Sequence, residues 1–134
     1  MSLSDIHILI VEDKADNYNL MLRLLTAMGI EHCAWLSSGW KVAEETEKRE
    51  RVDLILLDIN LPYEDGFVVH RKLREHPKLQ NTMIVAVTAN ADEKNMQRAI
   101  NDGFDGFIGK PINPDRFQEQ ICRALDGKPV WEWE

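Results

Sequence analysis

Residues 52–58 read VDLILLD, an apolar run that stops on an acid, and three further runs in the chain have the same form. These are HILIVED (7–13), ending on Glu12 and Asp13, MIVAVT (83–88), ending on Thr88, and GFIGKP (106–111), which carries Lys110. Short apolar runs separated by amphipathic segments are typical of parallel strands that are buried on both faces. The carboxyl ends of such strands share one edge of the sheet, where ligands bind. We therefore expect three acids, a hydroxyl and an ammonium to converge at that edge.

Strand-like and helix-like segments alternate five times along the chain. The expected strands cover 6–11, 30–36, 53–57, 83–87 and 104–108, and the expected helices cover 15–28, 40–50, 67–75, 91–102 and 114–125. Gly29 is a typical helix stop, and Asn113 before Pro114 is a typical helix start. The inner face of the second helix is expected to carry Trp40, Val42, Ala43 and Thr46. This pattern predicts an α/β fold with one doubly wound sheet.

The composition sets the outer limits of function. The 134 residues are the size of one domain, whose core we expect over 6–125 with a tail over 126–134. The net charge of −7 argues against direct binding of nucleic acid, because phosphate backbones require a basic surface. No apolar run approaches the roughly 20 residues of a membrane span, and no secretory signal opens the chain. We therefore expect a cytoplasmic protein with no membrane contact.

Cysteines, histidines and the tail lie outside the strand-end pattern. Cys33 and Cys122 show no metal-type spacing and are expected to be buried free thiols. The histidines also lack ligand spacing and are expected at the surface or half-buried with hydrogen-bond partners; they are His7, His32, His70 and His76. The tail reads VWEWE and is a frayed end, the stub of a longer protein, or a segment whose Trp131 and Trp133 dock on a surface of this chain or of a partner.

Taken together, these motifs resemble the receiver (response-regulator) domain family, the phosphoacceptor domains of two-component signalling. The resemblance covers about 6–125 and rests on five motifs in order: Glu12-Asp13, Asp58 within LLDINLP, Asp65-Gly66, Thr88-Ala89 and Lys110-Pro111. Each motif alone is common, whereas all five at successive strand ends are specific. The stretches VEDKADN and KPINPDRF are similar to those of stand-alone receivers and of receivers in hybrid sensor kinases. The resemblance implies a flavodoxin-like sheet of five parallel strands, (βα)5.

The resemblance also assigns roles to the residues at the strand ends. Asp58 would be the nucleophile that becomes a 4-aspartylphosphate. Mg²⁺ would be held directly by Asp13 and Asp58, through water by Glu12, and by the main-chain carbonyl of Asn60; oxygen ligands of this kind suit a hard divalent ion. Lys110 would pair with Asp58 and later with a phosphoryl oxygen, and Thr88 would donate its hydroxyl to another. A cis peptide is expected before Pro111.

The implied function is a signalling switch rather than an enzyme. A histidine kinase or a histidine phosphotransfer protein would supply the phosphoryl group, and the face formed by 91–125 would bind a downstream effector. Phe107 is either a simple core residue or, as in many members of the family, an aromatic that turns inward as Thr88 moves toward the phosphoryl group.

Other interpretations of the same residues stay open. Alone, Asp58 could cap a helix, Thr88 could bond to backbone and Lys110 could be a surface charge. Glu12 and Asp13 could form a solvated turn, although two adjacent acids that face a third are costly without a cation. A phosphatase of the haloacid-dehalogenase type also forms an aspartyl phosphate, but it needs an acid two residues after the nucleophile, where this chain has Asn60. A degenerate receiver that works without phosphate is a further alternative, against which the intact set of acids, hydroxyl and lysine argues.

Overall fold

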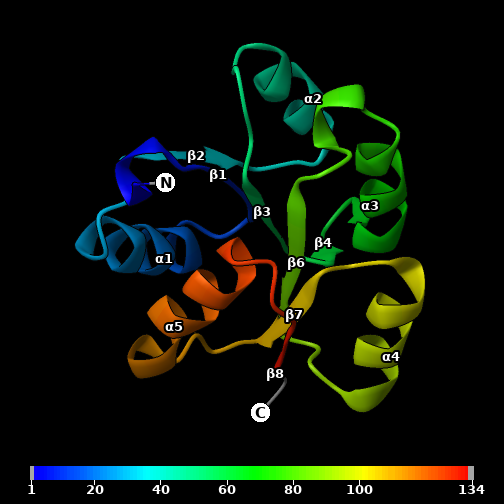
Figure 1. The fold of residues 1–134 in the computed structure, drawn as a ribbon. Helices are drawn as coiled ribbons and strands as arrows, with labels where there is room; N and C mark the ends of the chain where they lie inside the picture. The colour runs from blue at the N-terminus through cyan, green and yellow to red at the C-terminus, as the bar shows by residue number, and fades with distance from the viewer. Residues whose placement is uncertain (1, 133–134) are drawn as a thin grey trace.

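A parallel sheet lies between two layers of helices in the computed structural model, which describes residues 2–132 (Figure 1). The sheet has six strands: β1 (His7–Val11), β2 (His32–Leu36), β3 (Leu54–Leu57), β6 (Met83–Thr88), β7 (Gly106–Gly109) and β8 (Val130–Glu132). The α-helices are α1 (Ala15–Ala27), α2 (Trp40–Glu47), α3 (Gly66–Arg74), α4 (Glu93–Asp102) and α5 (Pro114–Leu125). Helices α1 and α5 cover one face of the sheet, and α2, α3 and α4 cover the other.

The strand order β2-β1-β3-β6-β7-β8 confirms the predicted flavodoxin-like, doubly wound topology. Strand β1 pairs with β2 on one side and with β3 on the other, so the direction of winding reverses at β1. All four residues of β3 are buried, as expected for a central parallel strand. Ligands in such folds bind outside the carboxyl ends of the strands where the winding reverses. The sheet therefore directs the ends of β1 and β3 toward one crevice.

A short antiparallel hairpin, β4 (Asn60–Leu61) with β5 (Glu64–Asp65), joins the end of β3 to α3. The side chain of Asp65 caps α3 by accepting a hydrogen bond from the Phe67 N–H. Gly66 follows, and a Cβ at this position would lie 2.3 Å from Cα of Ile59. The Asp65-Gly66 motif is therefore needed locally, because only glycine lets the start of the helix approach the strand end so closely. The two remaining short helices are η1 (Leu3–Asp5) and η2 (Pro77–Leu79).

The prediction of five strands was incomplete, because the tail adds a sixth. Strand β8 pairs in parallel with β7, with Trp131 opposite Phe107. Val130 is fully buried and Trp131 packs against the core, so this part of the tail docks on the chain's own sheet and is not frayed. Trp133 lies outside the described residues. A strand of three residues is too short to show the alternation of apolar and polar residues that identifies a strand, so the sequence did not reveal β8.

The predicted inner face of α2 was half right. Val42 and Thr46 are buried, whereas Trp40 is 81% exposed and Ala43 is also exposed. Trp40 opens the helix, and side chains of the first turn tilt back past its N-terminal end, away from the sheet. The helix also ends at Glu47, so it has room for little more than one buried pair at i and i+4.

Both cysteines are free thiols, as predicted, but the prediction that both are buried was wrong. Cys33 on β2 is partly buried, and burial raises the pKa of its thiol to about 11. Cys122 is exposed, because it lies on the outward face of α5, beside Ile121, which is buried.

Within residues 2–132, no helix combines the length and the apolar character that a membrane crossing requires.

His70 on α3 contradicts the expectation for the histidines. It is 1% exposed, and its ring stacks on Phe104 with centroids 4.0 Å apart, so it is neither at the surface nor half-buried. His70 follows Phe67 and precedes Leu73 by three residues each, so the helical period places it on the buried stripe. Burial, assisted by the charge of Arg74, lowers the pKa of His70 to about 4.

This buried histidine predicts a loss of stability in mild acid. The folded pKa of about 4 lies below the ordinary value of 6.5, so the unfolded chain takes up the proton first. The contribution of neutral His70 to the free energy of unfolding is fully present above pH 6.5 and is lost as the pH falls toward 4. The loss amounts to about 2 kcal/mol at pH 5. Replacing His70 with phenylalanine should remove that share of the pH dependence in urea denaturation at pH 7.5 and pH 5. Equal losses in the two proteins would contradict a neutral, buried His70.

Candidate functional site

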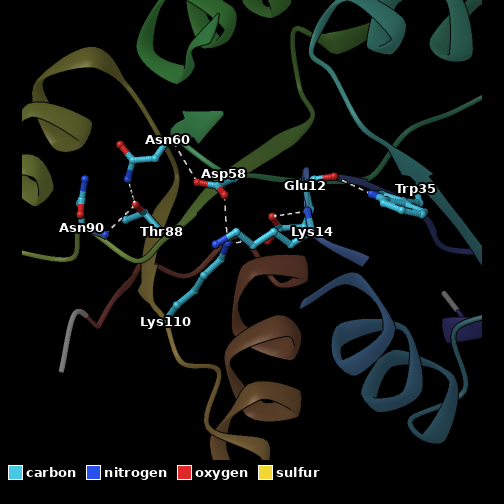
Figure 2. A network of polar contacts seen from close by, with 8 residues as sticks. All are labelled: Glu12, Lys14, Trp35, Asp58, Asn60, Thr88, Asn90 and Lys110. Atoms are coloured by element: carbon cyan, nitrogen blue, oxygen red, sulfur yellow. Dashed lines mark hydrogen bonds and ion pairs between the residues drawn. The ribbon is translucent and has the colours of Figure 1, made fainter. Parts of the chain in front are cut away.

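The polar residues predicted to converge do lie together at the carboxyl edge of the sheet, where Figure 2 shows all of them except Asp13. Glu12 and Asp13 directly follow β1, Asp58 follows β3, Thr88 ends β6 and Lys110 follows β7. Parallel pairing holds these strand ends in register, with Val11 opposite Leu57 and Thr88 opposite Gly109. The backbone of the sheet therefore brings together side chains up to 98 positions apart in sequence.

Asp58 is held by one donor on each carboxylate oxygen. The Asn60 N–H donates to Oδ1 at 2.8 Å, and Nζ of Lys110 donates to Oδ2 at 2.9 Å. Asp58 is 6% exposed, so its charge is largely removed from water. A buried carboxylate requires such partners, because an unpaired one would cost several kcal/mol. The arrangement fixes the orientation of Asp58 at the floor of the crevice.

Lys110 bridges two of the acids, since Nζ also donates to Oε1 of Glu12. Burial lowers the pKa of Lys110, but the hydrogen bonds to Glu12 and Asp58 outweigh it, so the pKa is raised and the ammonium stays charged. The peptide bond between Lys110 and Pro111 is cis, as expected. The lysine is therefore a fixed positive charge within reach of Asp58.

Glu12 is the most deeply buried acid of the site, at 1% exposed. Burial raises its pKa, and the hydrogen bond and charge of Lys110 oppose that rise. Its Oε2 accepts from the Lys14 N–H at 3.2 Å, and its main-chain carbonyl accepts from Nε1 of Trp35 at 2.6 Å. The Trp35 ring in turn stacks on Tyr18. Trp35 thus supports the backbone of the site, a role that sequence reasoning missed because a lone tryptophan in a weak strand carries no local signal.

Glu12, Asp13 and Asp58 form an acidic cluster that could hold a metal ion. Each contributes a carboxylate oxygen, and these oxygens all lie within 4.8 Å of one another. Three carboxylates against the ammonium of Lys110 leave an excess of negative charge in a partly buried crevice. A hard divalent cation that prefers oxygen ligands fits this donor set, which contains no sulfur or imidazole. Asn60, predicted to offer its carbonyl, adjoins the cluster through its hydrogen bond to Asp58.

Thr88 is fully buried and its Oγ1 is engaged by two asparagines. Nδ2 of Asn60 and the Asn90 N–H, the latter at 3.0 Å, both donate to this oxygen (Figure 2). A hydroxyl has two acceptor lone pairs and one proton, so two incoming bonds leave the proton as its remaining capacity. The metal role predicted for Asn60 uses its main-chain carbonyl and assigns no contact to its side chain. Its contact with Thr88, 28 positions away, could not have been found from local sequence.

Phe107 is fully buried on β7, where its neighbours in the sheet are Ala86 on β6 and Trp131 on β8. The buried position agrees with a core residue. Because Thr88 lies two residues beyond Ala86, the alternation of strand side chains puts Thr88 and Phe107 on the same face. Thr88 and Phe107 therefore lie on the same face of two adjacent strands, two residues apart in register.

Glu64 also reaches toward the loops around the site. Its Oε1 accepts from the Gly39 N–H at 2.8 Å and thereby ties the hairpin to the start of α2. Receiver domains, which the sequence resembles, usually have a hydrophobic residue at this position. The carboxylate instead supplies a link between two loops that no short motif predicted.

Comparison with known proteins agrees with this geometry. The family model described as response regulator receiver domain matches residues 8–122. The chain is 34% identical to the polar-differentiation response regulator DivK of Brucella anthropi, over 88% of this chain and 94% of that protein. It is 32% identical to the osmosensing histidine protein kinase SLN1 of Saccharomyces cerevisiae, over 93% of this chain but only 11% of that protein. The chain thus spans a small part of the kinase that it matches.

Solved structures give the same result. The receiver domain of the sensor histidine kinase PA1611 of Pseudomonas aeruginosa, which holds a magnesium ion in its active-site cleft, superposes with a TM-score of 0.78. It is 27% identical, over 90% of this chain and 98% of that one. The chemotaxis protein CheY4 of Vibrio cholerae gives a TM-score of 0.80 at 22% identity, over 89% and 98% of the two chains, which supports the fold alone.

The acidic cluster predicts unequal effects of two substitutions on Mg²⁺ affinity. Asp13→Asn removes a charge and a carboxylate oxygen, and we expect at least a tenfold loss of affinity. Asn60→Ala keeps the main-chain carbonyl, so its affinity should stay within about threefold of wild type. Titration followed by tryptophan fluorescence measures both, because the indole of Trp35 binds the Glu12 carbonyl beside the site. Equal losses in the two variants would contradict the assigned ligands.

Proposed function

Because the chain belongs to the response regulator receiver domain family of two-component signalling, we propose that Asp58 is its phosphoacceptor, in a reaction that depends on Mg²⁺. The observation that carries the proposal is the bridge from Lys110 to Asp58 and Glu12, beside three carboxylates whose oxygens lie within 4.8 Å. A structural helix cap would need neither the lysine nor the other two acids.

The proposed reaction is a phosphoryl transfer. An oxygen of the Asp58 carboxylate attacks the phosphorus of a phosphohistidine or a small phosphodonor, and the bond from phosphorus to the donor breaks with its electron pair going to the donor. Charge gathers on the three equatorial oxygens, so the site has to supply positive charge and donors. Lys110 provides the ammonium and Thr88 the hydroxyl proton that its two incoming hydrogen bonds leave free.

Magnesium would be held by the side chains of Asp13 and Asp58, through water by Glu12, and by the main-chain carbonyl of Asn60. When bound, the ion supplies charge that offsets the acids and the incoming phosphoryl oxygens. The excess of negative charge in the cluster supports this assignment. The single positive charge of Lys110 is shared between Glu12 and Asp58. A divalent cation would neutralise the negative charge of the three acids that remains.

Receiver domains pair with histidine kinases or histidine phosphotransfer proteins, and the relatives of this chain include a response regulator, a histidine kinase and a hybrid histidine kinase. We infer that residues 1–134 act as one such receiver domain in the cytoplasm, with a downstream effector binding the 91–125 face. We propose no direct contact with a membrane or with nucleic acid, which the net charge of −7 disfavours. The domain would act as a switch and not as an enzyme that turns over a substrate.

The phosphatase alternative is disfavoured by the residue two positions after Asp58. Asn60 carries an amide, which cannot act as the general acid that such phosphatases require. Its Nδ2 is also committed to the Thr88 hydroxyl.

The central test is the mass of the intact protein after incubation with acetyl phosphate. With Mg²⁺ present, wild type should gain one phosphoryl group per chain, and chelation of the metal should abolish the gain. Asp58→Asn should gain none. Asp115→Asn, which changes an exposed acid in the first turn of α5, is the matched control and should behave as wild type. Phosphorylation that persists in Asp58→Asn would remove Asp58 as the acceptor.

The role of Thr88 is tested separately from phosphorylation. Beryllofluoride stands in for the phosphoryl group on Asp58, and in wild type it should shift backbone NMR signals across 88–91 and 104–110. Thr88→Ala should bind the adduct but lose most of the shifts in 104–110, because the hydroxyl that links the two regions is absent. A variant with the full wild-type pattern would show that Thr88 does not couple them.

A further inference from the structure

Strand β8 completes the core on both sides of the sheet. Val130 is fully buried among the residues under α5, and Trp131 packs against the cluster under α4, which contains Phe107. Successive residues of a strand face opposite sides, so three residues suffice to reach both layers. Figure 1 shows β8 beside β7, at the edge between α4 and α5. The face expected to bind an effector is therefore closed at its edge by this chain's own tail.

The docking of β8 depends on particular residues. A Cβ at Gly106 would lie 2.9 Å from the carbonyl oxygen of Val130, so the glycine in β7 makes the close approach possible. The link from α5 is also held, because Nη2 of Arg123 donates to the Pro129 carbonyl at 2.7 Å and the Lys128 N–H donates to the Arg123 carbonyl at 2.9 Å. These contacts place the tail on one edge in one register.

Strand β7 joins this edge to the phosphorylation site. Lys110 immediately follows β7, and its N–H donates to the Thr88 carbonyl at 2.8 Å. Phe107 lies between Ala86 and Trp131 in the sheet. Strand β7 thus contains Phe107, which pairs with Trp131, and is followed directly by the site residue Lys110.

We propose that the edge of β7 is a docking site for an extended segment, that residues 130–132 occupy it while Asp58 is unmodified, and that phosphorylation of Asp58 weakens this docking. The inference rests on the proposed function. Phosphoryl oxygens attract the Thr88 hydroxyl away from Asn60 and Asn90, which opens space beside Ala86, a small residue. Phe107 then moves toward β6 and loses contact with Trp131. Strand β8 loses part of the apolar surface that holds it.

The kind of partner follows from what β8 leaves behind. The edge of β7 would present backbone N–H and C=O groups with an apolar slot on each side, one vacated by Val130 and one by Trp131. An added strand satisfies such groups, and side chains in alternate slots give specificity. The fitting occupant is an extended peptide of an effector with two adjacent large apolar residues.

Hydrogen exchange of the wild-type chain tests the linkage directly. In Mg²⁺, saturating beryllofluoride should speed amide exchange at 130–132 at least fivefold and leave β2 (His32–Leu36), at the opposite edge, unchanged. Unchanged or slower exchange at 130–132, with the adduct visible by ¹⁹F NMR, would overturn the inference while leaving the proposed function intact. Failure of any adduct to form would overturn the proposed function and this inference with it.

Linkage is reciprocal, so loosening β8 should favour the adduct. Trp131→Ala should lower the half-saturating beryllofluoride concentration at least fivefold, whereas Trp40→Ala, a loss of an exposed indole on α2, should not change it. Equal behaviour of the two variants would count against the coupling. If Trp131→Ala does not fold, the hydrogen-exchange measurement on the wild-type protein is the deciding test.

Discussion

The Lys110 ammonium, set between Asp58 and Glu12, is the interaction on which the rest of the site depends. Buried carboxylates at neighbouring strand ends repel one another, and a fold that brings them together must supply a positive charge nearby. The lysine does so from the strand farthest along the chain among those that form the site. Its position is held by the hydrogen bond of its own N–H to the Thr88 carbonyl and by its charge pairs. The ammonium therefore offsets the repulsion in the crevice.

The parallel sheet explains why so much of this site could be predicted from sequence. Four apolar runs identify four strands, and a parallel sheet requires their carboxyl ends to lie at one edge. The residue that follows each run is then placed by the backbone and not by side-chain packing. Glu12, Asp13, Asp58, Thr88 and Lys110 all converge as predicted. Their roles in phosphorylation and metal binding come from the family and stay proposals.

The parts that sequence reasoning missed depend on contacts between distant side chains or on very short elements. The Asn60 amide binds Thr88 across 28 positions, and no local pattern contains that pair. His70 reads as a polar residue, yet the period of α3 places it inward, where Phe104 covers its ring. Strand β8 is three residues long and becomes a strand only because β7 offers an edge and Gly106 offers space. Tertiary context decides the Asn60 contact and the formation of strand β8. The position of His70 is different, because the helical period of α3 already places it on the buried stripe.

The arrangement of β7 has a consequence for how such a domain can signal. A strand in the middle of a sheet is paired on both sides, and its displacement is resisted by both neighbours. Without β8, β7 would be the edge strand, free on one side and easily moved by events at Thr88 and Lys110. With β8 in place, any motion of Phe107 toward β6 must also separate it from Trp131. In the proposed switch, the sixth strand would make the unmodified state costlier to leave, and the strength of the switch would depend on how tightly residues 130–132 are bound.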